Sequence, residues 1–341
     1  MLVSKPEAPR SSQPLATPRL RRRYWTLLTT LLALSALFAF GLLAWDNPMP
    51  VGTEGFWIIA RMRATSLVVI LIVAFCQAIA TVSFQTATNN RIITPSIMGF
   101  ESLYRAVQTS SVYFLGVAGI TAIQGVSQFL LQVALMVGFA LLLYGWLLSG
   151  RYGNLQVMLL VGIILGAGLG SVSTFMQRLL TPSEFDVLAA RLFGSISHAD
   201  AAYLPYAIPL TAIAGGALWA NAKNLNLLSL GRDAATSLGI NHRRQTMVTL
   251  FFVSILMAVS TALVGPMTFL GFLVATLAYQ LADTYDHRYI FPMSVATAFI
   301  VLTGSYFVMK HVFYAQGVVS IIIELVGGTL FLIVILRKGR L

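Results

Sequence analysis

Charged side chains are scarce in this sequence. Only 10% of its 341 residues are Asp, Glu, Lys or Arg, whereas soluble domains are nearer a quarter charged. Hydrophobic residues make up 57% of the chain, and the mean hydropathy is +0.82. This composition excludes an ordinary soluble domain and indicates a protein built from many membrane-spanning helices, each of about 20 apolar residues.

Cysteine is almost absent, since Cys76, in an apolar run, is the single one. A disulfide within the chain and a cysteine cluster for a metal are therefore excluded. We interpret Cys76 as a small buried hydrophobic residue.

Sequence motifs of enzymes are also absent. No G-x-x-x-x-G-K-S/T motif is present to hold ATP phosphates, and no H-E-x-x-H motif is present to hold zinc. The four histidines are scattered in or near predicted loops, at His198, His242, His287 and His311. No nucleophile–base–acid set is visible, and acidic residues within apolar runs are too few for an obvious proton relay. We therefore expect no catalytic residue, no metal site and no cofactor bound by this chain.

Long apolar runs dominate what is present, and they predict an all-α polytopic membrane protein with about ten transmembrane helices. The predicted spans are Thr26–Trp45, Leu67–Phe84, Ser96–Val117, Gln124–Leu148, Leu155–Met176, Ala201–Ala220, Thr246–Val264, Phe269–Ala282, Ile290–Met309 and Val318–Leu336. We expect outer loops at Asp46–Ala60 and Gln177–Asp200. The short run Phe269–Ala282 follows Gly265-Pro266, whose irregular backbone must be buried in protein or line a cavity.

The chain ends are basic, which sets the predicted topology. Residues 1–23 carry Pro6, Pro9, Pro14 and Pro18 and predict a disordered basic tail, followed by a transmembrane domain over 24–341. With both ends in the cytoplasm, roughly sixteen of the 22 Lys and Arg residues lie inside and about five outside, as the positive-inside rule expects. The net charge of +11 is thus a topology signal and no sign of nucleic-acid binding.

One polar stretch interrupts the apolar interior of the chain. Leu225–Arg244 is rich in basic residues, and Lys223 precedes it, giving a predicted cytoplasmic element over 223–244. The run Asp233–Leu238 is compatible with a short helix, bracketed by Gly231 and Gly239. Spacing alone leaves two interpretations open, a simple connection between two spans or a handle for a soluble partner.

Several residues inside the predicted spans are candidates for function. Gly162, Gly166 and Gly170 repeat at four-residue spacing, which fits close helix packing and also a smooth face on a translocation path. Glu324 is a charge within a span, hence a candidate on that path, although it could instead reach water or pair with Lys310 near the outer end. Glu101 and Arg105 are spaced to form an i,i+4 ion pair.

The polar element carries a long and specific resemblance. Its pattern is similar to the coupling loop in permeases of binding-protein-dependent ABC importers for ferric siderophores and cobalamin. The matching residues are Leu228, Ser229, Leu230, Gly231, Ala235, Ser237, Leu238, Gly239, Ile240 and Arg243. The resemblance implies that this element docks in a groove of an ATPase subunit, with Arg232 and Arg243 at the rim.

Other stretches extend the resemblance from about residue 60 to the C-terminus. Residues 84–104, FQTATNNRIITPSIMGFESLY, are similar to the branch serving petrobactin, vibriobactin and anguibactin, although Arg91 stands where proline is usual. Phe193-Gly194-Ser195 and Gly265–Gly271 match further family motifs, whereas Ala275-Thr276 and Tyr279 depart from the usual pattern.

The family commonly carries an R-x-P-R motif at the start of the second span, where the arginines meet acidic residues of the binding protein. Arg63 falls on the first arginine and Ser66 on the second. Arg61 is a candidate substitute and Lys310 a further cation, so we expect these three residues to dock the binding protein. An alternative is that Arg61 and Arg63 are ordinary interfacial anchors.

The resemblance implies a permease subunit in the bacterial cytoplasmic (inner) membrane that imports a ferric siderophore. Its implied partners are a second permease subunit, identical or different, two ABC ATPase subunits that hold ATP and Mg²⁺, and an extracytoplasmic substrate-binding protein. Import of cobalamin or haem by the same mechanism is an alternative. So are an ion-coupled secondary transporter, for which no convincing internal repeat is visible, and an intramembrane enzyme, which lacks a catalytic motif.

Overall fold

The computed structural model describes residues 13–45, 47–122, 125–149, 155–196, 199–313 and 319–337. These residues form α-helices and two short 3-10 turns, and no strand occurs among them. The elements are α1 Pro18–Ala44, α2 Glu54–Ala87, η1 Pro95–Met98, α3 Phe100–Ala122, α4 Val126–Ser149, α5 Leu155–Gln177, α6 Pro182–Leu192, η2 Ala201–Tyr203, α7 Leu204–Ala220, α8 Ala222–Leu228, α9 Arg232–Ser237, α10 His242–Val264, α11 Leu270–Ala282, α12 His287–His311 and α13 Val319–Arg337. The predicted all-α class is confirmed for the described residues.

Seven helical segments in the described part of the chain are long and apolar enough to cross a membrane. They coincide with seven of the predicted spans and lie in α1, α2, α4, α5, η2–α7, α10 and α12. The other three predicted spans coincide with α3, α11 and α13. Of these, α11 and the apolar part of α13, Val319–Thr329, are shorter than a full span.

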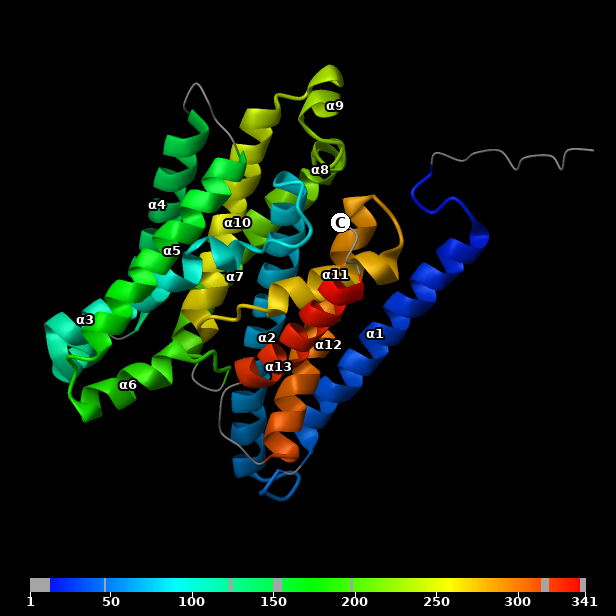
Figure 1. The fold of residues 1–341 in the computed structure, drawn as a ribbon. Helices are drawn as coiled ribbons and strands as arrows, with labels where there is room; N and C mark the ends of the chain where they lie inside the picture. Colours follow the sequence, from blue (N-terminus) through cyan, green and yellow to red (C-terminus); the bar gives the residue numbers. More distant parts are fainter. Residues whose placement is uncertain are drawn as a thin grey trace, which may run out of the picture.

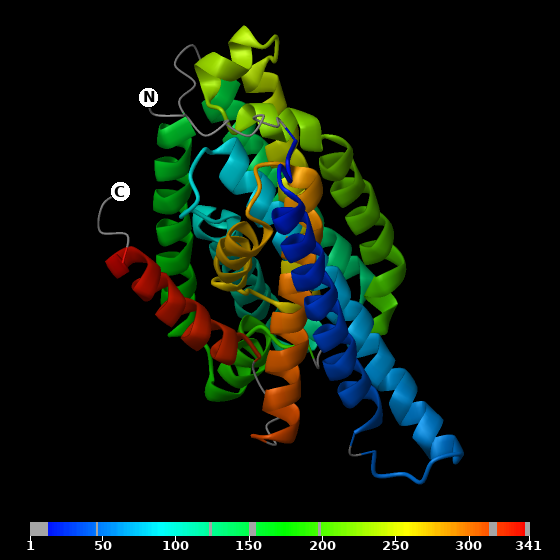
Figure 2. The same cartoon turned by 90° about the vertical axis from the view of Figure 1, so that its right-hand side faces the viewer.

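Helix α2 forms the centre of the bundle (Figures 1 and 2). Its second half is buried almost without interruption from Val69 to Ala87, and it packs against α10, α12, α7 and α11. Its 34 residues correspond to roughly 51 Å at 1.5 Å per residue, so its first turns project past the rest of the bundle beside α1 (Figure 2). The elements α8 and α9 stand at one end of the bundle and α6 at the other (Figure 1).

The predicted basic tail is wrong for residues 18–23, which form the first turns of α1. Thr17 caps this helix, since its side chain accepts a hydrogen bond from the Leu20 amide, and Pro18 occupies the first turn, where its missing N–H is no loss. Arg23 pairs with Asp283 at 3.3 Å, and Thr284 donates to the Pro14 carbonyl, so the helix start is attached to the α11–α12 connection. Residues 1–12 of the predicted tail and 338–341 of the predicted domain lie outside the described residues.

Both predicted outer loops contain helix. Glu54–Ala60 belongs to α2, because Thr53 caps the Phe56 amide and Glu54 stands in the first turn. The second predicted loop holds α6, which begins with a capping box between Thr181 and Glu184. Leu188 of α6 is fully buried against Val112 of α3, so this short helix lies on the end of the bundle.

Candidate functional site

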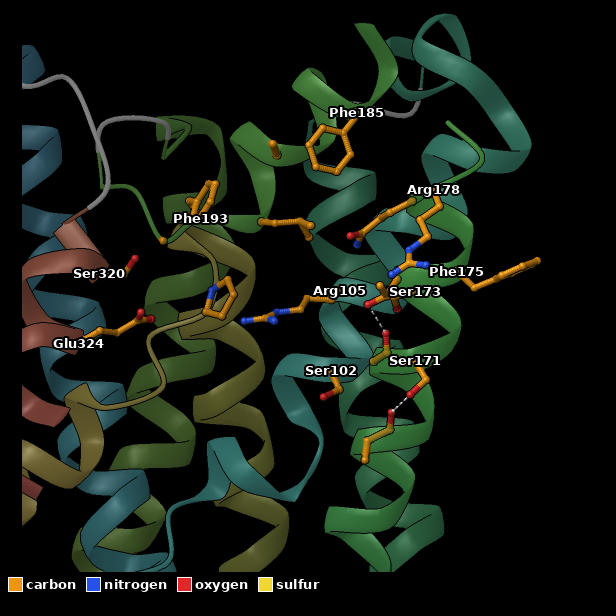
Figure 3. Close-up of a pocket in the computed structure, with 18 residues that line it drawn as sticks. Ser102, Arg105, Ser171, Ser173, Phe175, Arg178, Phe185, Phe193, Ser320 and Glu324 are labelled. Atoms are coloured by element: carbon orange, nitrogen blue, oxygen red, sulfur yellow. Dashed lines mark hydrogen bonds between the residues drawn. The ribbon is translucent and has the colours of Figure 1, made fainter. Parts of the chain in front are cut away.

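A cavity of about 810 Å³ opens between α3, α5, α6 and α13. Figure 3 shows the side chains that line it. The described residues of its wall are Ser102, Arg105, Ala167, Gly170, Ser171, Ser173, Thr174, Phe175, Gln177, Arg178, Phe185, Ala189, Leu192, Phe193, Gly194, Pro266, Ser320 and Glu324. The wall therefore combines hydroxyl groups, three phenylalanine rings, two arginines and one carboxylate.

One side of the cavity is set by the packing of η1 and α3 on α5. A Cβ added to Gly166 would lie 3.0 Å from the Gly99 Cα, and one added to Gly162 would lie 3.3 Å from the Met98 carbonyl oxygen. Gly162 and Gly166 therefore serve close packing and do not line the cavity, whereas Gly170 of the same series does. Of the three glycines predicted for a translocation path, Gly170 therefore lines this cavity, whereas the other two lie against Met98 and Gly99.

Part of the cavity wall forms where the segment Phe193–Ser195 meets the Gly265-Pro266 connection, two motifs from distant parts of the sequence. Gly194 lies against the Gly265–Pro266 connection so closely that an added Cβ would be 2.6 Å from the Pro266 carbonyl oxygen. The Ser195 amide donates to the Val264 carbonyl at 2.8 Å. Gly265 and Pro266 are buried and Pro266 also lines the cavity, which confirms the expectation for this irregular backbone.

The charged side chains of the wall come from three elements. Arg105 of α3 and Glu324 of α13 extend toward each other across the cavity, and Arg178 enters it from the end of α5 (Figure 3). Glu101 does not form the predicted ion pair with Arg105 in the described residues. It is buried instead, and its carboxylate accepts a hydrogen bond of 2.5 Å from Thr268 in the α10–α11 connection.

Sequence reasoning found Glu324 and Gly170, placed Arg105 only in an ion pair with Glu101, and assigned no role to Arg178. A signal for Arg105 was present, because an arginine within an apolar run is expensive unless it faces protein or water. No comparable signal marks Arg178, which follows the last residue of α5 and resembles any basic residue at a helix end.

The predicted polar element stands at the far end of the bundle from α6 (Figure 1). The short helix α9 follows the prediction closely, and Gly231 and Gly239 on either side have φ of +90° and +85°, a backbone region that favours glycine. Ala235 is fully buried and fixes α9 to the bundle, and Ser237 is exposed. Leu230 and Leu238 are more than half exposed, with Arg232 and Arg243 exposed beside them, so the element presents an apolar surface with a basic rim.

A buried hydrogen-bond network joins this element to two long helices. Asn226 of α8 donates to Asp286 at 3.0 Å, and its carbonyl oxygen accepts from the His287 backbone amide at 2.9 Å and from His287 Nδ1 at 2.6 Å. The other ring nitrogen of His287 lies 2.7 Å from the Thr86 hydroxyl of α2. Because the Asn226 oxygen can only accept, Nδ1 of His287 carries the proton in this arrangement.

Asp286 is the charged member of this network and caps α12. Its side chain is only 1% exposed, and it accepts from the Arg288 backbone and guanidinium as well as from Asn226. Burial raises the pKa of Asp286, but the hydrogen bonds from Arg288 and Asn226 outweigh burial, so its pKa lies below the ordinary value.

The three predicted docking cations lie in the first turns of α2 and the last turn of α12, toward the end of the bundle opposite α8 and α9 (Figure 1). Arg61 is exposed, whereas the Arg63 guanidinium donates to the carbonyls of Leu43 and Trp45 at 3.3 and 2.7 Å. Arg63 therefore satisfies carbonyls at the end of α1 as well as carrying its charge. Lys310 lies in the last turn of α12 and is partly buried. Among the described residues, no group of His, Cys, Asp and Glu is placed to hold a metal ion.

Comparisons with known proteins agree on one family. A profile of the FecCD transport family matches residues 26–337. The chain is 55% identical to the petrobactin import system permease protein FatC of Bacillus anthracis over 97% of this chain and 94% of that protein. It is 36% identical to the petrobactin import system permease protein YclO of Bacillus subtilis (strain 168), over 87% of this chain and 90% of that protein.

One solved structure has a similar fold. It is a transporter assigned to the metal-chelate type of ABC transporters, in an inward-facing conformation, and it superposes with a TM-score of 0.78 at 20% sequence identity. The match covers 92% of this chain and 99% of that one.

Proposed function

The chain belongs to the FecCD transport family, and from this premise we propose that it is the transmembrane permease subunit of an ATP-driven importer for a ferric siderophore. The observation that carries the proposal is the 55% identity to a petrobactin import permease over 97% of this chain. A chelate of the petrobactin class is the proposed substrate, and the cavity between α3, α5, α6 and α13 is its proposed path through this subunit.

The cavity also supports the need for a second permease subunit. Helices α5 and α13, which form two of its walls, leave large apolar side chains exposed, among them Leu160, Ile164 and Leu325 at 57%, 60% and 72%. Such surfaces face either lipid or protein in a membrane. A second permease packed against these helices closes the cavity into a path between the two subunits.

The surface of Leu230, Leu238, Arg232 and Arg243 is the proposed docking site for an ATPase subunit. An apolar patch with a basic rim fits a groove on a soluble partner, and its attachment through Ala235 carries motion of the partner into the bundle. The substrate-binding protein docks at the opposite end, where Arg61, Arg63 and Lys310 lie. We propose that the chain crosses the cytoplasmic membrane ten times and that both chain ends lie in the cytoplasm.

Reconstitution tests the proposal directly. The chain is assembled in proteoliposomes with a partner permease, ATPases and a binding protein, and uptake of radioactive ferric petrobactin is measured. We expect uptake that requires ATP and the binding protein, and an ATPase carrying a Walker A motif that purifies with the chain. Uptake that persists without ATP but needs an ion gradient would contradict the proposal in favour of a secondary transporter. Preference for haem or cobalamin would assign the same mechanism to another substrate.

A further inference from the structure

The charged residues of the cavity point to a specific chemistry of recognition. We propose that Arg105 and Arg178 form an anion-binding site for the chelate, and that the Glu324 carboxylate, which faces Arg105 across the cavity, weakens the binding of an anion at this site. The inference rests on the proposed function and adds the groups that hold the substrate inside the permease.

The depth of Arg105 is the first argument. Gly99 packs against Gly166, and Gln177 donates to the Thr109 hydroxyl at 3.1 Å, so α3 and the outer half of α5 run parallel. Arg105 lies between these two contacts, at a level within the apolar helix of residues 156–177. An arginine at such a depth is rare and marks a functional path by default.

The remaining donors of the wall make the second argument. The hydroxyls of Ser171, Ser173 and Thr174 donate to carbonyls one turn earlier on α5 at 3.0, 2.7 and 2.9 Å, so their hydrogens are used within the helix. In the described chain, the side chains of Arg105 and Arg178 make no hydrogen bond and no ion pair. The strongest donors available to a ligand are therefore the two guanidinium groups, which match carboxylate and catecholate oxygens.

The apolar part of the wall fits the same class of ligand. Phe175, Phe185 and Phe193 belong to the same wall, although Phe175 points away from both guanidinium groups (Figure 3), and the rings of Phe175 and Phe193 are more than half exposed. Aromatic rings pack against aryl groups, and guanidinium groups bind their oxygen atoms. The wall is thus suited to an iron chelate with aromatic, negatively charged oxygen ligands.

Glu324 explains how such a site can release its ligand. Its carboxylate extends toward Arg105 from the opposite wall (Figure 3) without forming an ion pair among the described residues, so its negative charge repels an anion bound to the guanidinium. A transport path has to bind its substrate weakly enough to let it leave. The carboxylate therefore lowers the affinity of the site and promotes release.

Binding and transport by the complete complex test the proposal. Wild type, Arg105→Gln, Arg178→Gln and Glu324→Gln are assembled with the partner permease and ATPases in nanodiscs, and equilibrium binding of ferric petrobactin is measured without the binding protein. Each arginine variant should lose affinity by roughly tenfold or more, because it loses a charge-assisted hydrogen bond to the anion. Glu324→Gln should bind more tightly and turn over more slowly in the transport assay.

The sign of the Glu324→Gln effect separates this role from a purely structural one. If Glu324 only supports the packing of α13, Glu324→Gln lowers the thermal midpoint and leaves chelate affinity unchanged or weaker, which overturns the proposal. Arg22→Gln is the matched control, because Arg22 is an exposed arginine at the start of α1. If the wild-type complex imports the chelate but both arginine variants bind it as tightly as wild type does, the anion site is overturned and the proposed function stands. Absence of wild-type import would overturn the proposed function and this site with it.

Discussion

At Gly194 the fold leaves no room for a side chain. A Cβ there would lie 2.6 Å from the Pro266 carbonyl oxygen and 3.3 Å from the Ser320 Cβ. The first neighbour is backbone, which cannot rotate away. We expect Gly194→Ala to destabilise the chain by about 1–3 kcal/mol, as overpacking of a buried contact does, and to reduce transport because Pro266 lines the cavity. Thermal unfolding of the purified chain in detergent measures the first effect.

The control for this substitution is Gly138→Ala in α4, where nothing lies within 4 Å of the added Cβ. Alanine in a helix is favoured over glycine by up to about 1 kcal/mol, so this variant should match or exceed the wild-type midpoint. Equal midpoints for Gly194→Ala and Gly138→Ala would show that the Phe193–Ser195 segment can move away from Pro266.

Asp286 gives the chain an acid-sensitive contact. Its pKa is lowered in the folded state, so its contribution to stability is fully present above the pKa of the unfolded chain, about 3.9 for Asp. That contribution is lost as the pH falls through the lower folded value. We expect Asp286→Asn to be less stable than wild type by about 1–3 kcal/mol at pH 7. The difference should stay constant down to about pH 5 and shrink below about pH 4. Thermal midpoints of both proteins across this range measure it, and a constant gap down to pH 3.5 would contradict a charged role for Asp286.

At the scale of elements, apolar run length predicted where helices form but not how they meet. All ten predicted spans coincide with helices, because an apolar run in lipid has to satisfy its backbone internally. The short helix α9 was predictable from Gly231 and Gly239. Helix α6 was missed, since its run of 11 residues is short and amphipathic and its partner Val112 lies in a distant segment. The cavity wall was missed for the same reason, as Arg105, Arg178 and Glu324 come from three separated elements.

The network of Asn226, His287 and Thr86 joins three elements, α8, α12 and α2, through buried polar atoms. Thr86→Val keeps the shape of the side chain but removes the hydroxyl next to His287. The ring nitrogen then loses its partner in a buried position, which costs about 1–3 kcal/mol. Because α8 precedes the proposed ATPase-docking surface, we also expect fewer chelates imported per ATP hydrolysed. Thermal unfolding and paired measurements of uptake and ATP hydrolysis in proteoliposomes check both effects.

Thr303→Val is the comparison for Thr86→Val. The Thr303 hydroxyl is equally buried, but it donates within α12 to the Phe299 carbonyl at 2.6 Å and to no other element. We expect this variant to keep the wild-type ratio of uptake to ATP hydrolysis. A similar loss of coupling in both variants would mean that any buried hydroxyl affects transport and that the network carries no special connection.

At the scale of the whole molecule, the topology between Arg22 and Asn224 depends on α3, which is not among the seven candidate spans of the described chain. The stretch between α2 and α3 is irregular, and its residues 94–96 and 98–99 are buried in protein, as non-helical backbone at membrane depth must be. Helix α3 begins beside Gly166, in the middle of α5, and reaches Gln177 at the C-terminal end of α5. We therefore expect the irregular stretch and α3 together to complete one crossing.

Labelling of single cysteines tests this crossing. Cys76 is fully buried, so it need not be removed, and the variants are Arg22→Cys, Ser183→Cys and Asn224→Cys at exposed positions. In right-side-out membrane vesicles, a maleimide that cannot cross the membrane should label Ser183→Cys at once. Arg22→Cys and Asn224→Cys should react only after permeabilisation. The reason is that α1 to α5 then give an odd number of crossings between Arg22 and Ser183, and α7 adds one more before Asn224.

Labelling of Arg22→Cys and Ser183→Cys from the same side would show that α3 does not cross the membrane. The reason is that α3 decides whether the number of crossings between these two residues is odd or even. If α3 did not complete a crossing, α1, α2, α4 and α5 would leave Arg22 and Ser183 on the same side, with Asn224 across the membrane from both. Binding-protein docking at Arg61 and ATPase docking at Leu230 and Leu238 would then fall on one face. An importer that takes substrate from outside and draws energy from cytoplasmic ATP cannot work in that arrangement. Labelling of Ser183→Cys and Arg22→Cys from the same side would therefore contradict both the ten-span topology and the proposed placement of the two partners.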